Sequence, residues 1–164
     1  LQTWHRALAV DGFLMFSCLG PDTLRELRDV YAQQGWPAPA HEYTDMHDWG
    51  DMLIAAGYTE PVMDVERITL SYTSAKVLLR DLAQWGHNLH PQRFAGLRGK
   101  KWLAQLELAI EEKIAAQIHQ GGMRLTFEVI YGHAIQASPR IAVKDTSQIS
   151  LEDMKRMLQQ KPNS

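Results

Sequence analysis

Two arginines, Arg80 and Arg124, carry the side chains best suited to substrate binding in this sequence. A guanidinium offers a planar fork of N–H donors, which matches the two oxygens of a carboxylate. Arg80 lies in an expected helix beside an apolar stripe, and Arg124 lies at the start of an expected strand. Either arginine could therefore bind a substrate carboxylate. The alternative for each is a surface ion pair with a nearby acid such as Asp81 or Glu128.

The single cysteine and the histidines have less to offer. Cys18 ends an apolar strand shortly before an expected helix N-terminus, which would favour a thiolate, but a buried structural thiol is the commoner outcome. Metal binding needs three or four converging ligands. His47 and Asp48 are adjacent in an expected helix and point about 100° apart. We therefore expect surface or capping roles for the histidines, and no metal site.

Glycine-rich motifs that bind phosphate, of the G-x-G-x-x-G or P-loop type, are absent from the sequence. The segment from Gly96 to Lys100 is superficially similar, but its spacing differs and it follows a loop rather than a strand. No cofactor cradle is therefore expected in it.

The composition predicts one globular domain with a core. The chain has 164 residues, 45% of them hydrophobic and 22% charged, with 17 Lys+Arg against 19 Asp+Glu. This balanced charge argues against a nucleic-acid-binding module. The longest apolar run, Gly12 to Gly20, is shorter than the roughly 20 residues that a membrane helix needs. One cysteine excludes an internal disulfide. We expect a soluble, cytoplasmic protein.

Hydrophobic periodicity predicts three strands and four main helices. The strands are expected at Val10–Cys18, Val62–Tyr72 and Met123–Tyr131. The helices are expected at Pro21–Tyr31, Asp45–Ala56 with Thr44 as its cap, Ser74–Trp85 and Lys100–Ile118. The second strand changes its apolar parity near Glu66 and Arg67, which predicts a bulge there.

The order of these elements, with helices between successive strands, predicts an α/β sheet. Three strands make a narrow sheet with exposed edges, and the chain starts at Leu1 close to an apolar strand. We therefore expect a fragment, with residues 1–136 forming half of a domain. Residues 137–164 are expected to be a polar tail with a short helix around Met154. A homodimer through the exposed sheet edge would be one way to cover it.

Several collinear stretches resemble one enzyme family. The segment from Phe16 to Arg28, FSCLGPDTLRELR, resembles the part that follows a strand in the malonyl-[acyl-carrier-protein] O-methyltransferases of biotin synthesis. The runs Asp45–Asp51, Leu79–Leu82 and Leu125–Ala134 agree with the same family in the same order. The similarity covers about residues 1–136.

The resemblance implies the Rossmann-like fold of class I methyltransferases that use S-adenosylmethionine. In that fold this chain is the C-terminal half. Its strands would be the fifth, sixth and seventh, and the last would be antiparallel. The resemblance also implies that the absent N-terminal half holds most of the S-adenosylmethionine. We therefore assign no cofactor-binding residue to this chain and expect it to be inactive alone.

The same resemblance implies methyl transfer to the free carboxylate of malonyl-acyl carrier protein or malonyl-CoA. Ligands of open α/β sheets lie beyond the carboxyl ends of the strands, an edge that would include Ser17, Tyr72 and Arg124. Arg80 matches a position where the family often has arginine. These four residues are the predicted substrate-binding residues, while the catalytic residue stays unknown.

Two other readings stay open. The same segments also resemble methyltransferase-like assembly factors of respiratory complex I, which implies modification of arginine rather than of a carboxylate. The third reading is a noncatalytic fragment that self-associates and binds no cofactor. Use of a malonyl acceptor distinguishes the first reading from both.

Overall fold

The computed structural model describes residues 1–116 and 122–138, together with residues 152, 154 and 155. The described strands are β1 (Phe13–Leu19), β2 (Thr59–Tyr72) and β3 (Met123–Ile135). The described helices are α1 (Gln2–Ala7), α2 (Arg25–Gln33), α3 (Met46–Ala55), α4 (Ala75–Trp85) and α5 (Lys100–Ala116). Most of the polar tail expected to carry a short helix lies outside the described residues. In the described part, no helix has the length and apolar character needed to cross a membrane.

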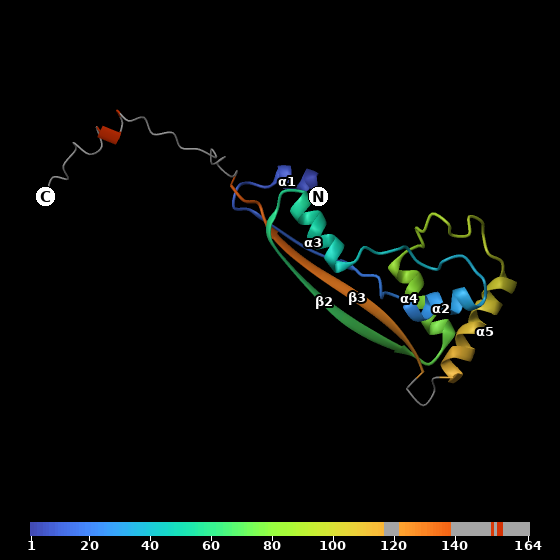
Figure 1. Ribbon diagram of the computed structural model, residues 1–164. Helices are drawn as coiled ribbons and strands as arrows, with labels where there is room; N and C mark the ends of the chain where they lie inside the picture. Colours follow the sequence, from blue (N-terminus) through green and yellow to red (C-terminus); the bar gives the residue numbers. More distant parts are fainter. Residues whose placement is uncertain (117–121, 139–151, 153, 156–164) are drawn as a thin grey trace.

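The strands form one sheet in the order β1-β3-β2, and β3 is antiparallel to both neighbours. This confirms the expected α/β fold with three strands, an antiparallel last strand and flanking helices. The two outer strands pair with different lengths of β3. The pairing of β1 ends where Leu19 faces Val129. In contrast, β2 continues until Tyr72 faces Met123. The β2–β3 pair therefore extends well past the end of β1 (Figure 1).

The start of α2 takes the place of β1 beside the extended part of β3. The backbone N–H of Leu24 donates to the carbonyl of Thr126 at 2.7 Å. The N–H of Thr126 donates to the carboxylate of Glu26 at 2.9 Å, and its hydroxyl donates to the same carboxylate at 2.6 Å. Polar groups of β3 that would otherwise face an empty edge are thus satisfied.

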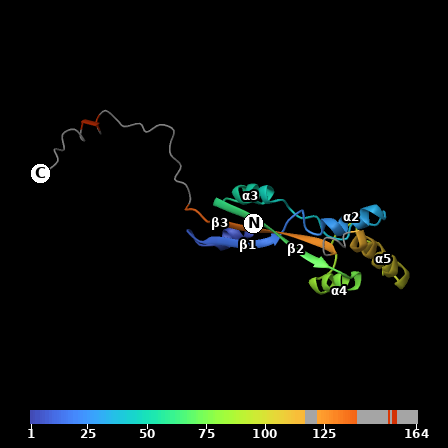
Figure 2. The same ribbon diagram turned by 90° about the horizontal axis from the view of Figure 1, so that it is seen from below.

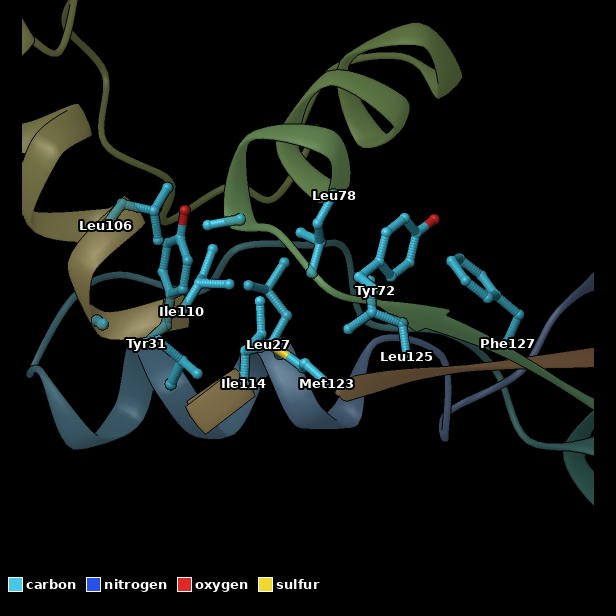
Figure 3. Close-up of a cluster of buried hydrophobic side chains, with 13 residues drawn as sticks. Leu27, Tyr31, Tyr72, Leu78, Leu106, Ile110, Ile114, Met123, Leu125 and Phe127 are labelled. Carbon is cyan, nitrogen blue, oxygen red and sulfur yellow. The ribbon is translucent and has the colours of Figure 1, made fainter. Parts of the chain in front are cut away.

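The larger hydrophobic core lies at this end of the sheet, between α2, α4, α5 and one face of β2 and β3 (Figure 3). Leu78, Ile110 and Leu125 are fully buried in it. They come from α4, α5 and β3, so residues far apart in the sequence meet at its centre. This core fixes the relative positions of the three helices.

A smaller core lies at the other end of the sheet, beneath α3. Leu53, Tyr58 and Ala134 are buried there, and Phe16 and Met63 pack against them. Residues of opposite parity on β2 and β3 enter the two cores, which therefore lie on opposite faces of the sheet. Figure 2 shows α3 and α4 on opposite sides of the strands accordingly.

This arrangement corrects the expected bulge near Glu66 and Arg67. The pairing of β2 with β3 is continuous from Val62 to Tyr72, and the irregularity lies instead between Thr59 and Val62. The apolar parity changes because β2 leaves the smaller core after Met63 and enters the larger core at Leu70, on the other face.

Two expected helix starts are also corrected. Pro21 lies in a turn and α2 begins only at Arg25, after Leu24 in the left-handed conformation with φ 57°. The cap of α3 is Asp45 rather than Thr44, because the Asp45 carboxylate accepts from the N–H of His47 at 2.7 Å.

The N-terminal segment differs from expectation as well. Helix α1 was not predicted, and β1 starts at Phe13 rather than at Val10. The strand starts late because the backbone turns at Asp11, which has φ 64°, before Gly12 bonds to Gln136.

Candidate functional site

A cavity of about 750 Å³ opens at the carboxyl end of β1. Its walls come from the end of β1, from α2 and α4, from the loops before α3 and after α4, and from single residues of α5 and β3. They include Leu19, Thr23, Leu24, Leu27, Tyr31, Pro39, Ala40, His41, Tyr43, Leu79, Leu82, Ala83, Trp85, Gly86, His87, Asn88, Leu89, Trp102 and Phe127. This is the edge of an open α/β sheet where ligands bind.

The walls of the cavity are mostly apolar. Leucines and aromatic rings supply most of them, and the ring of Trp85 lies 4.6 Å from that of Phe127. The polar members are few and include His41, Tyr43 and Asn88. A site of this size and character can enclose a flexible, largely apolar ligand while a few polar groups orient it.

The turn that joins β1 to α2 carries Thr23 to the cavity wall and is fastened to β3. The hydroxyl of the fully buried Thr23 donates to the carbonyl of Glu128 and accepts from its N–H, both at 3.2 Å. The carboxylate of Glu128 accepts from the N–H of Asp22 at 2.9 Å. One residue of β3 therefore holds three points of the turn, because the N–H of Gly20 also donates to the Glu128 carbonyl at 2.9 Å.

Glu128 is buried, with its side chain 8% exposed, and it needs a compensating charge. Arg67 supplies this charge, with its guanidinium 3.1 Å from the Glu128 carboxylate and 3.0 Å from that of Asp22. A Cβ on Gly20 would lie 2.5 Å from the Glu128 carboxylate. The turn can therefore lie this close to Glu128 only with glycine at position 20. Glu128 therefore pairs with Arg67, and the sequence did not predict this role.

Glu26 joins the start of α2 to β3 through the hydrogen bonds that it accepts from Thr126. Burial raises the pKa of its carboxyl group, but the hydrogen bonds from the hydroxyl and N–H of Thr126 outweigh burial and lower the pKa below its usual value. The ionised form is thus the one that the fold prefers. In the sequence, Thr126 and Glu128 belong to the polar parity of an alternating strand, so no local signal marked either carboxylate contact.

The opposite rim of the cavity is a loop held by side-chain to backbone hydrogen bonds. Asn88 donates from Nδ2 to the carbonyl of Ala38 and accepts at Oδ1 from the N–H of His90, both at 2.8 Å. His90 is buried and accepts at Nδ1 from the N–H of Gln92 at 3.0 Å. These bonds join the loop after α4 to the loop before α3, so the rim has a defined shape.

Arg80 and Tyr72, two of the predicted substrate-binding residues, are related through one acid. Arg80 is exposed and lies 3.6 Å from Asp81. Tyr72 is buried at the end of β2, where burial and the Asp81 charge raise the pKa of its hydroxyl. The ion pair considered for Arg80 is therefore present, although neither Arg80 nor Tyr72 belongs to the cavity wall.

Of the other two predicted residues, Ser17 lies away from this pair, whereas Arg124 lies in the register position next to that of Tyr72. Ser17 is exposed on β1, where it faces Tyr131 of β3. Arg124 is exposed on β3 and faces Ser71 of β2. The structure therefore does not gather the four predicted residues at one point, and the cavity beside them comes from side chains that the sequence did not single out.

Burial raises the pKa of the Cys18 thiol, which keeps it protonated at neutral pH. This favours the structural reading of the cysteine. No group of three or more metal-ligating side chains comes together within the described residues.

Comparison with known proteins gives one consistent result. No family model matches the chain. It is 44% identical over 142 residues to the malonyl-[acyl-carrier protein] O-methyltransferase of Laribacter hongkongensis, which covers 85% of this chain and 46% of that protein. The protein of the same name from Gallionella capsiferriformans is 45% identical over 138 residues, or 84% and 46% of the two chains. The one from Halorhodospira halophila is 37% identical over 155 residues, or 93% and 52%.

The expected resemblance is thereby confirmed, and the relatives carry the name of a methyltransferase. The chain spans about half the length of the curated relatives that it matches. Both the turn at Gly20–Thr23 and the cavity lie within the similar part.

Proposed function

We propose that this chain is the acceptor-binding half of an S-adenosylmethionine-dependent O-methyltransferase of biotin synthesis. It would act in the cytoplasm on the free carboxylate of a malonyl thioester, malonyl-acyl carrier protein or malonyl-CoA. The observation that carries the proposal is the large apolar cavity at the carboxyl end of β1, in a chain 44% identical to an enzyme of that name.

The chemistry asks little of a general base. A carboxyl group with a pKa of about 4 is already ionised at neutral pH, so its oxygen is a competent nucleophile. The protein must instead hold this oxygen in line with the methyl group and exclude water, which strengthens every charge interaction in the site. The apolar side chains of Leu24, Leu82 and Phe127 suit that task.

S-adenosylmethionine is the methyl donor that this proposal implies. The chain has no glycine-rich motif of the cofactor-binding type, and the carboxylates of Glu26 and Glu128 are already bonded within the fold. These residues do not fit a cofactor site, so we assign the cofactor no contacts in this chain. Such contacts would come from the other half of a protein as long as the relatives.

Arg80 remains the proposed partner of the acceptor carboxylate. Its neighbours Leu79 and Leu82 on α4 line the cavity, which supports a role for Arg80 toward an acceptor bound there. Its contact with Asp81 is an exposed ion pair, which is weak and easily exchanged for a substrate carboxylate. Tyr72 would support it through the shared Asp81, whereas Ser17 and Arg124 are proposed only as edge residues.

The test uses a chimera that joins the first half of the Laribacter hongkongensis relative to this chain. We expect it to methylate malonyl-CoA but not acetyl-CoA, which has no free carboxylate. Arg80→Ala should lower kcat/KM for the malonyl acceptor about tenfold or more, as loss of a charged hydrogen bond predicts. The KM for S-adenosylmethionine should not change.

Lys76→Ala is the matched control, because Lys76 is an exposed cation on the same helix. Thermal melts establish that each variant is folded. A folded chimera that binds S-adenosylmethionine and leaves malonyl thioesters unmethylated overturns the proposed function. Unchanged acceptor kinetics in Arg80→Ala overturns the role of Arg80 alone.

A further inference from the structure

A second hollow, of about 210 Å³, adjoins the large cavity on the side of α5. The two share Tyr31, Pro39, Asn88 and Trp102 as walls. The hollow differs from the cavity in its chemistry, because Arg93 and Arg98 line it.

Arg98 is held by aromatic rings. Its guanidinium carbon lies 3.9 Å from the ring centre of Trp102, 4.9 Å from that of Phe94 and 6.0 Å from that of Tyr31. Stacking of this kind fixes the plane of a guanidinium and leaves N–H donors at its edge able to bind an anion. Arg98 also interacts with the Tyr31 hydroxyl, where it opposes the rise in pKa that burial causes. The cation is thus oriented before any ligand arrives.

The surroundings of Arg98 favour an anion. The sequence between Asp81 and Glu107 contains Arg93, Arg98, Lys100 and Lys101 and no acidic residue, in a chain whose net charge is −2. Within the described part of the chain, no carboxylate lies at ion-pair distance from Arg93 or Arg98. Arg93 is itself oriented, since its Nη1 donates to the carbonyl of His90 at 3.3 Å.

We propose that this hollow binds the phosphate group of the acceptor's pantetheine arm, with Arg98 as its main ligand and Arg93 as the second. The proposal rests on the proposed function and deepens it. Acyl carrier proteins and coenzyme A both attach the thioester to the same arm, and both place a phosphate at its far end. With the reacting end at the carboxyl edge of β1, the apolar cavity takes the arm and the hollow beyond Trp102 takes the phosphate. A planar guanidinium fork matches phosphate oxygens in geometry and charge.

The test measures binding to this chain directly and needs no methyl transfer. Calorimetry compares 4′-phosphopantetheine with pantetheine, which lacks only the phosphate. We expect the phosphorylated compound to bind about tenfold or more tightly, as charged hydrogen bonds predict. Arg98→Ala should remove this difference and leave the affinity for pantetheine unchanged. Arg98→Lys should restore only part of it, because an ammonium does not stack or form a fork.

Lys101→Ala is the matched control, since Lys101 is an exposed cation of the same acid-free segment that does not line the hollow. It should change the affinity for phosphopantetheine less than about twofold, because an exposed charge is screened by salt. Arg93→Gln gives a second reading if Arg98→Ala disturbs the aromatic cluster, which a thermal melt reveals. Arg93→Gln should weaken the binding of 4′-phosphopantetheine and leave that of pantetheine unchanged.

Several results would overturn the proposal. Equal affinities for the two compounds mean that the arginines do not bind the phosphate. An equal loss of both affinities in Arg98→Ala means the same. Coenzyme A and a carrier protein with its arm attached should both lose affinity in Arg98→Ala. A loss confined to the carrier protein means that the arginines contact the protein surface instead. Phosphate-selective binding without methylation by the chimera would overturn the proposed function and leave the phosphate site standing.

Discussion

The two ends of β3 lie in cores of different quality. Among the described residues, the larger core contains thirteen buried residues and is covered by α2, α4 and α5, whereas the smaller core contains three, beneath α3. The buried side-chain atoms that lack a hydrogen-bond partner within the described residues belong to His5, Trp49, Tyr58 and Gln136, all at the end of the smaller core. The end that carries the cavity is therefore internally satisfied, and the other end is not.

The exposed side chains give the same contrast. Phe13, Met15 and Val62 lie on the face of the sheet opposite α3 and are 59%, 68% and 62% exposed. Burying a large apolar side chain stabilises the folded protein by about 1.5–3 kcal/mol. A cover over this face would therefore stabilise the β1 end more than the cavity end. The chain's relatives are about twice its length, which leaves room for such a cover.

Truncating one leucine in each core gives the largest expected effect and tests the comparison directly. Leu125→Ala should lower the free energy of unfolding by about 3–5 kcal/mol, because a cavity remains among three helices that cannot collapse around it. Leu53→Ala, equally buried, should cost about 2–3 kcal/mol, because the smaller core can relax more. Urea denaturation measures both. Equal losses would mean that the two cores are equally rigid.

Two glycine substitutions sharpen the comparison within the smaller core. A Cβ on Gly132 would lie 2.3 Å from the ring of Phe16, so Gly132→Ala should destabilise the protein by about 1–3 kcal/mol through overpacking. A Cβ on Gly50 of α3 would meet only Met63, at 3.8 Å. Gly50→Ala should therefore stabilise the protein by about 0.5–1 kcal/mol, since alanine favours helix. Thermal melts measure both variants. Melting temperatures that shift in the same direction for Gly132→Ala and Gly50→Ala would contradict the expected difference.

A modest, pH-dependent effect concerns Glu26, at the cavity end. Its pKa is lower in the folded protein, so its ionised form stabilises the fold above the unfolded pKa of about 4.3, and this stability is lost as pH falls through the folded pKa. Glu26→Gln should cost about 1 kcal/mol at pH 7 and less at an acidic pH below the folded pKa. Glu112→Gln, on the exposed surface of α5, is the control and should change little at either pH. A cost for Glu26→Gln that does not vary with pH contradicts a role for its charge.

Local patterns predicted most elements and missed what depends on distant contacts. The helices α3 and α4 and the antiparallel last strand follow from periodicity and from the family resemblance. The parity change near Glu66 was ambiguous, because a bulge and a passage between two cores produce the same pattern in one strand. Only the pairing with β3 distinguishes them.

The candidate site was harder to predict than the fold. Arg80 and Tyr72 were chosen by residue type and sheet edge, yet the cavity walls come from helices, strands and loops spread from Leu19 to Phe127. Glu26 and Thr126 are 100 residues apart, and Thr23 and Glu128 are 105 apart, so no local spacing reveals these pairs. The acid-free segment around Arg98 was visible in the sequence, but the aromatic rings that orient it become evident only in three dimensions.

The contact between Glu26 and Thr126 has a consequence for hydrogen–deuterium exchange. The amide of Thr126 is bonded to a side chain of α2 rather than to a neighbouring strand. Its proton becomes exposed when the start of α2 lifts away, even while β2 and β3 stay paired. One backbone proton therefore reports how often the wall of the cavity opens, separately from the unfolding of the sheet.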